Sequence, residues 1–209
     1  MGESCHVWPV LALKNTFYTS SSTSPQRPAM LAANTNIPLP PPSFWNLTGD
    51  ATIEGTELSL STNQHQVVDA HAIPTGSIKS FPGINPNKPV TLGAKDMSID
   101  HAFVLESDPS KVSIDTRASG FKHALHMYHA KTGIHLDVET TEPAFQVYTG
   151  EGIGAEGGGR KFGARSGIAI EPSRYVNAVN TPEWRHMVVL KKGEVWGSKS
   201  RFTAWMEAK

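Results

Sequence analysis

Two strand-like runs joined by a short glycine turn constrain this fold more than any other feature. These runs are residues 124–130 and 134–141, the second of which alternates between apolar and polar side chains from Ile134 to Glu139, and Lys131, Thr132 and Gly133 separate them. This pattern predicts a β-hairpin with glycine in the turn. Convincing helical periodicity and internal repeats are both hard to find, so we predict an all-β protein. Further strands are expected within 52–61 and at 102–105, 144–148, 167–170, 186–190 and 200–205.

Composition supports short strands joined by turns. Charged residues make up only 18% of the chain, which contains 18 glycines and 15 prolines. The 19 basic and 19 acidic residues cancel, so no global field favours nucleic acid or an anionic membrane as partner. Cys5 is the only cysteine, which excludes an intrachain disulfide and favours a reducing, cytoplasmic location. No apolar run approaches the length of a membrane span.

Residues 1–42 differ in character from the rest. They contain the stretches "TSSSTSPQRP" and "IPLPPP", which favour extended or polyproline-like backbone and lack a sustained period. We therefore expect a Pro/Ser-rich leader, disordered or non-homologous, over 1–42 and a β-domain over 43–209.

Glu171 is the first candidate for chemistry. It follows an apolar run at 167–170 and precedes Pro172, which we expect to end regular pairing. A partly desolvated carboxylate has a raised pKa, as a general base requires. The alternative is a strand-end glutamate that meets solvent or pairs with an arginine such as Arg174.

Two further polar residues accompany expected strands. Asp100 precedes an apolar run at 102–105, where it can accept hydrogen bonds from sugar hydroxyls and be oriented by His101, or simply terminate a loop. Gln146 lies among apolar and aromatic residues of 144–148. Its amide needs a protein or ligand partner.

Two other groups of residues invite a binding interpretation. Among the histidines near the hairpin, His123 and His129 are expected on one face of a strand and His126 on the other, so with His135 they form no metal site. The glycine-rich stretch 150–163 superficially resembles a phosphate loop but lacks the G-x-x-x-x-G-K-[ST] pattern. We expect a flexible loop between two strands there.

Taken in order, a series of short motifs resembles the aldose 1-epimerase (galactose mutarotase) family. They are "SFWNLTG" (43–49), "IPTGSI" (73–78), "IDHAF" (99–103), "TTEPAFQVYTG" (140–150), "GIAIEP" (167–172) and "NAVN" (177–180). The resemblance implies a large antiparallel β-sandwich that interconverts α and β anomers of hexoses such as galactose and glucose. It extends over 43–209 but covers only the C-terminal portion of the family's domain, so an N-terminally incomplete sandwich is expected.

The resemblance also implies residue roles. Glu171 matches the catalytic base that takes the proton from the anomeric hydroxyl, while Asp100 and Gln146 match residues that hold the sugar. No cofactor or metal is implied. Ser173 stands where the family usually has a glutamine, and Pro42 stands where it has the histidine that protonates the ring oxygen.

Because proline can neither donate nor accept a side-chain proton, three interpretations stay open at this stage. The chain is a mutarotase with impaired activity, a non-catalytic carbohydrate-binding remnant, or a truncated form of a working enzyme. Sheet edges and apolar faces left uncovered by missing strands would favour self-association.

Overall fold

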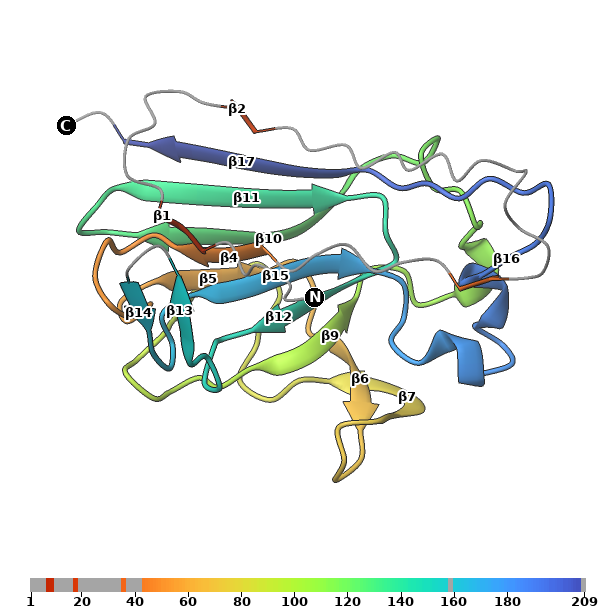
Figure 1. Ribbon diagram of the computed structural model, residues 1–209, viewed down its shortest axis with the longest axis horizontal. Coiled ribbons are helices and arrows are strands. Elements are labelled where there is room, and N and C mark those ends of the chain that lie inside the picture. The colour runs from red at the N-terminus through yellow and green to blue at the C-terminus, as the bar shows by residue number, and fades with distance from the viewer. Residues whose placement is uncertain (1–6, 10–16, 19–34, 37–42, 158–159, 208–209) are drawn as a thin grey trace.

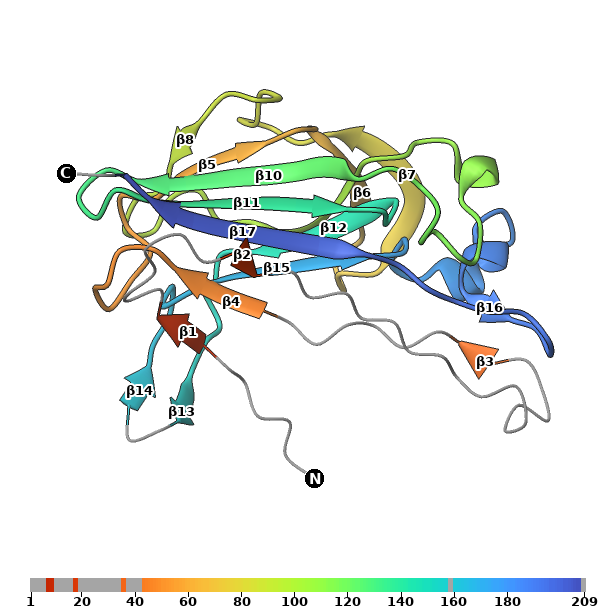
Figure 2. The same ribbon diagram turned by 90° about the horizontal axis from the view of Figure 1, so that it is seen from above.

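The computed structural model describes residues 7–9, 17–18, 35–36, 43–157 and 160–207, and the statements below concern these residues (Figure 1). Most of them form two β-sheets packed face to face, whose strands run largely along the longest axis of the molecule (Figures 1 and 2). The predicted all-β sandwich is confirmed.

The two sheets have seven and six strands. The first sheet has the order β1 (Val7–Pro9), β4 (Ser43–Asn46), β15 (Ile168–Ser173), β12 (Ala144–Tyr148), β9 (Asp100–Val104), β6 (Gln64–Val68) and β7 (Pro74–Ser80). The second has the order β2 (Phe17–Tyr18), β17 (Ser200–Met206), β11 (Ile134–Thr140), β10 (Lys122–His129), β5 (Glu57–Leu60) and β8 (Val90–Thr91). Neighbouring strands are antiparallel, except that β1 runs parallel to β4.

Smaller elements complete the structure. A two-stranded ribbon joins β13 (Ala155–Gly157) to β14 (Arg160–Phe162), and β16 (Val189–Leu190) pairs with β3 (Thr35–Asn36). Three short 3-10 helices are η2 (Pro109–Lys111), η3 (Ala178–Asn180) and η4 (Arg185–Met187).

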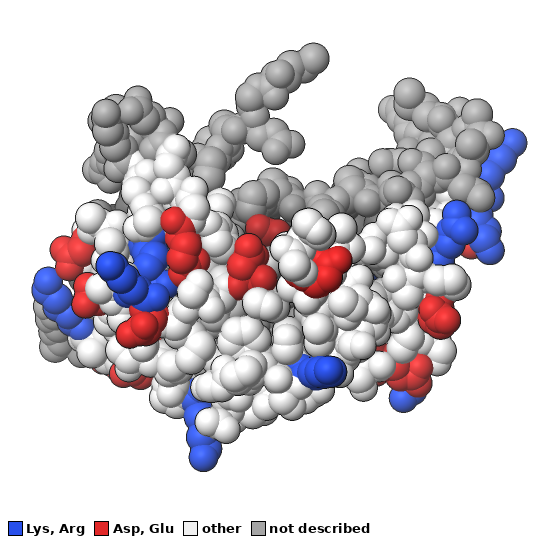
Figure 3. Space-filling model, turned by 90° about the horizontal axis from the view of Figure 1, so that it is seen from below, with Lys and Arg blue, Asp and Glu red and all other residues white. Residues whose placement is uncertain are grey.

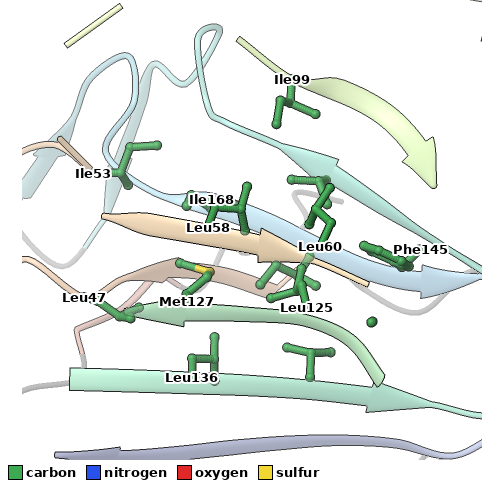
Figure 4. Packing of buried hydrophobic residues seen from close by; sticks show 14 of the residues in the cluster. Leu47, Ile53, Leu58, Leu60, Ile99, Leu125, Met127, Leu136, Phe145 and Ile168 are labelled. Atoms are coloured by element: carbon green, nitrogen blue, oxygen red, sulfur yellow. The ribbon is translucent and has the colours of Figure 1, made fainter. Parts of the chain in front are cut away.

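The main core lies between the two sheets and is built by alternation along the strands. On β11, the buried positions begin at Ile134 and recur at every second residue, and their partners on the facing sheet include Phe145 of β12 and Ile168 of β15 (Figure 4). Because successive side chains of a strand point to opposite faces, the residues between these core positions face away from the sandwich. On the first sheet, those outward positions carry the candidate site.

A second apolar cluster covers one end of this outward face. Val104 of β9 and Ala144 of β12 pack there against residues of the η3–η4 region, namely Tyr175, Ala178, Trp184, Met187 and Val188. Beyond this cluster, the next outward position along β12 is the half-buried Gln146, whereas along β9 the buried Ala102 comes next and the exposed Asp100 follows it.

Most of the strand predictions were correct. The hairpin of β10 and β11 is confirmed, as are strands at 102–105, 144–148, 167–170 and 200–205. The expected strand at 186–190 is wrong over its first half, which forms η4. The expected loop at 150–163 is also wrong, because it contains the ribbon of β13 and β14, which projects from the sandwich in Figure 2.

The expected leader at 1–42 lies mostly outside the described residues. Its described pieces are the short strands β1, β2 and β3, which pair with β4, β17 and β16 respectively. Strand β1 thus covers part of the free edge of β4, and β2 covers part of the free edge of β17.

Candidate active site

Asp100, Gln146 and Glu171 lie on one face of the first sheet. Their strands β9, β12 and β15 are adjacent, and Gln146 pairs directly with Glu171. Asp100 pairs with Tyr148, two residues along β12 from Gln146. All three alternate with core residues, so the structure brings together on the outward face the side chains that the sequence analysis selected.

A hydrogen bond joins two of these side chains. Gln146 Nε2 donates to Asp100 Oδ1 over 2.7 Å. This contact uses the donor end of the amide, and Gln146 Oε1 has no hydrogen bond to any described residue. The pair therefore presents a carbonyl oxygen and a second carboxylate oxygen, both able to accept hydrogen bonds from hydroxyl groups.

Glu171 has no such partner. It is half-buried, and among the described residues no hydrogen bond or ion pair involves its carboxylate. Burial raises the pKa of Glu171 above its usual value, and the negative charge of Asp100 raises it further. A half-buried carboxylate without a partner and with a raised pKa has the properties of a general base.

The alternative in which Glu171 pairs with Arg174 is not what the structure contains. Arg174 Nε lies 3.1 Å from Glu142 Oε2, in a buried ion pair without hydrogen-bond alignment. Burial lowers the pKa of Arg174 and raises that of Glu142. The guanidinium also donates to the backbone oxygen of Ile114 over 2.9 Å. Its partners are therefore Glu142 and Ile114 and not Glu171.

The expectation that Pro172 ends regular pairing is wrong for the pairing of β15 with β12. Strand β15 continues to Ser173, and Pro172 pairs with Phe145 of β12. Pairing with β4 stops at Ile170, which is opposite Ser43. The position without an N–H group thus lies beyond the pairing with β4, where no ladder hydrogen bond is lost.

Two neighbours of the site residues do not join the site. His101 faces inwards, where its ring lies 5.1 Å from that of His65 and 5.0 Å from that of Phe81, so Gln146 and not His101 orients Asp100. Ser173 is buried and pairs with Ala144, at the end of the face covered by the second cluster.

The expected orientation of the hairpin histidines is wrong. A register shift between His123 and Leu125 changes which face His123 occupies relative to the rest of β10. His123 Nε2 and His126 Nδ1 consequently both approach Asp137 Oδ1, at 3.4 and 2.8 Å. His129 is instead buried beside Thr132. Within the described part of the chain, no three His, Cys, Asp or Glu side chains are arranged to hold a metal ion.

The position of the family's acid histidine falls outside the described residues, since these resume at Ser43 and the position is occupied by Pro42. Ser43 pairs with Ile170, the residue before Glu171. Strand β4 thus begins opposite the residue that precedes the candidate base.

Two outward-facing residues near the site were missed from the sequence. Tyr148 lies beside Asp100, and its hydroxyl accepts a hydrogen bond from the Gly152 N–H. Its spacing of two from Gln146 on a strand is a signal that could have found it. Gln66 of β6 is almost fully buried, but "QHQVV" shows no clean alternation that would assign its face.

Comparison with known proteins identifies the family. A sequence model described as Aldose 1-epimerase matches residues 43–203, so the chain belongs to the aldose 1-epimerase family. It is 36% identical over 167 residues to the bifunctional protein gal10 of Schizosaccharomyces pombe, which covers 79% of this chain and 23% of that protein.

Other relatives give the same family and fold. The chain is 29% identical over 186 residues to the galactose mutarotase of Rattus norvegicus, covering 83% of this chain and 51% of the relative. The crystal structure of a GalM/aldose epimerase homologue from C. elegans matches with a TM-score of 0.63 at 22% identity, covering 80% of this chain and 50% of the other. The chain thus spans about half the length of the galactose mutarotase and less of the bifunctional protein.

Among the described residues, no helix is long and apolar enough to cross a membrane. Basic and acidic side chains are interspersed on the face seen in Figure 3, without a broad patch of either sign.

Proposed function

We propose that this chain acts on free hexoses and interconverts their α and β anomers, with Glu171 as the base and Asp100 and Gln146 as hydroxyl-binding residues. The observation that carries the proposal is the half-buried Glu171 carboxylate, which has no hydrogen bond or ion pair to the described residues, beside the hydrogen-bonded Asp100–Gln146 pair. Membership of the aldose 1-epimerase family supports the same reaction. Galactose and glucose are the proposed substrates.

The reaction begins when Glu171 removes the proton of the anomeric hydroxyl. The ring C–O bond breaks, the ring oxygen takes up a proton, and an open-chain aldehyde forms. Rotation about the C1–C2 bond followed by the reverse transfers closes the ring as either anomer. Because Pro42 has no transferable proton, the proton for the ring oxygen comes from water in this chain. Loss of a general acid typically slows catalysis by about 10²–10⁴-fold, so we propose an impaired activity.

Sugar binding without turnover is the second candidate. Pro42 at the acid position favours it, because the remaining oxygen acceptors can hold hydroxyls without completing proton transfer. Asp100 Oδ2, Gln146 Oε1 and Glu171 would then serve as a hydroxyl-binding set.

Polarimetry of freshly dissolved α-D-galactose tests the proposal. We expect the chain to accelerate mutarotation above buffer and Glu171→Gln to remove at least 90% of that acceleration. Glu54→Gln, a matched change at an exposed glutamate, should leave it unchanged. An unaltered rate in Glu171→Gln would show that another group is the base. Galactose-dependent NMR shifts at Asp100 and Gln146 without turnover would establish the binding function instead.

A further inference from the structure

The outward face of the first sheet changes abruptly from open to closed next to Gln146. Asp100 is exposed and Gln146 is half-buried, whereas Ala102, which pairs with Gln146, is only 4% exposed. His65 pairs with Phe103 in antiparallel register, which places Gln66 beside Ala102, and Gln66 is 1% exposed. Adjacent strands are about 4.8 Å apart, so the covered region begins one strand away from the candidate sugar-binding residues.

Gln66 forms hydrogen bonds to the segment that covers this part of the sheet. Gln66 Oε1 accepts a hydrogen bond from the Val176 N–H over 2.8 Å, and Gln66 Nε2 donates to the Val176 oxygen over 3.3 Å. The side-chain amide thus pairs with both backbone groups of one residue far along the chain. Both of its ends are used, so Gln66, unlike Gln146, has no end turned towards a ligand.

The tied segment is residues 174–180, which we call the wall segment. It follows β15 directly, so it continues from the strand that carries Glu171. The side chains of Tyr175 and Ala178 are buried in the second apolar cluster and hold the wall segment on the sheet. The side chain of Val176 is 40% exposed, which leaves it able to contact a ligand.

We propose that Gln66 is a positioning residue that holds the wall segment against the side of the sugar remote from Glu171. The inference rests on the proposed function, because it assigns a boundary to the same site. The strand order places Glu171, Gln146, Ala102 and Gln66 in one row across the sheet. A hexose whose anomeric hydroxyl meets Glu171 therefore extends along this row towards the wall segment. Gln66 acts on sugar binding and not on proton transfer.

Gln66→Met tests this role, since methionine keeps the length of the side chain and removes both hydrogen bonds. Because the variant loses both hydrogen bonds to the wall segment, we expect the KM for D-galactose, or its Kd, to rise roughly tenfold with kcat unchanged. Gln64→Met is the matched control. Gln64 lies two residues away on the same face of β6 and donates to Asn63 and Ser80 but not to the wall segment.

Amide hydrogen exchange in the unmodified chain gives a readout that does not depend on turnover or on any variant folding. Saturating D-galactose should slow exchange within residues 174–180. If galactose perturbs Asp100 or Gln146 and leaves that exchange unchanged, the wall segment is no part of the site and the inference is wrong, while the proposed function stands. If galactose perturbs neither region, both fail. Equal effects of Gln66→Met and Gln64→Met on KM would also overturn the assigned role.

Discussion

At the scale of single residues, the environment of Glu171 disfavours the charged carboxylate that the proposed reaction needs. Its carboxylate is half-buried next to Asp100 and has no hydrogen bond or ion pair to any residue that the structure describes, and both the burial and the charge of Asp100 raise its pKa. A group whose pKa is raised on folding favours the folded state when protonated, and this contribution is lost as the pH rises through the folded-state pKa. At neutral pH, the charged Glu171 therefore destabilises the fold that the proposed reaction requires.

Glu171→Gln should accordingly raise the free energy of unfolding at pH 7.5, because a neutral amide carries no charge into this position. The gain should shrink as the pH falls through the raised folded-state pKa of Glu171, and be least below the ordinary glutamate value of 4.5, where the carboxyl group is protonated in both states. Urea unfolding at the two pH values measures this. A variant less stable than the parent at pH 7.5 would contradict the assigned environment of Glu171.

The sequence singles out the candidate site residues but not the contacts between them. Glu171 was selectable because it directly follows an apolar run. The bond from Gln146 to Asp100 was not, because 46 residues separate them and only the register of β12 on β9 brings them together. The faces of His123 and His126 depended on a register shift that the repeating apolar pattern does not encode.

At the scale of elements, the same limit explains which strands were found. Strand β11 alternates between buried and partly exposed side chains over all seven of its residues, which is a strong signal. Strand β6 buries both His65 and Gln66 and has a register irregularity before Val68, so its five residues resemble no regular strand.

Gly150 lies two residues after the end of the site strand β12 and provides an element-scale prediction. Its φ is +84°, and an added Cβ would collide with the Gly167 oxygen and lie 2.8 Å from Ile153 Cδ1. Gly150→Ala should destabilise the chain by on the order of 2–4 kcal/mol through strain and overpacking. Gly193→Ala, at φ +90° with open space around it, should cost only about 1 kcal/mol. Equal midpoints of urea unfolding for the two variants would refute the steric argument.

At the scale of the whole molecule, the free edges of the sheets determine the expected self-association. Strand β17 spans seven residues, and within the described part of the chain β2 pairs with it only at Phe202 and Thr203. Edge strands with unpaired backbone groups template pairing with other chains. We expect self-association that increases with concentration, measured by sedimentation velocity. A monomer over the whole accessible concentration range would contradict this expectation.

The central claim is that the ionisation of Glu171 controls anomer interconversion. The most direct test measures two midpoints on one sample, the ¹³C NMR titration of the Glu171 carboxyl and the pH dependence of galactose mutarotation. The two should coincide above the ordinary glutamate value, and both should move to lower pH in Asp100→Asn because a neighbouring negative charge is removed. Separate midpoints, or a mutarotation rate indifferent to the ionisation of Glu171, would contradict the account.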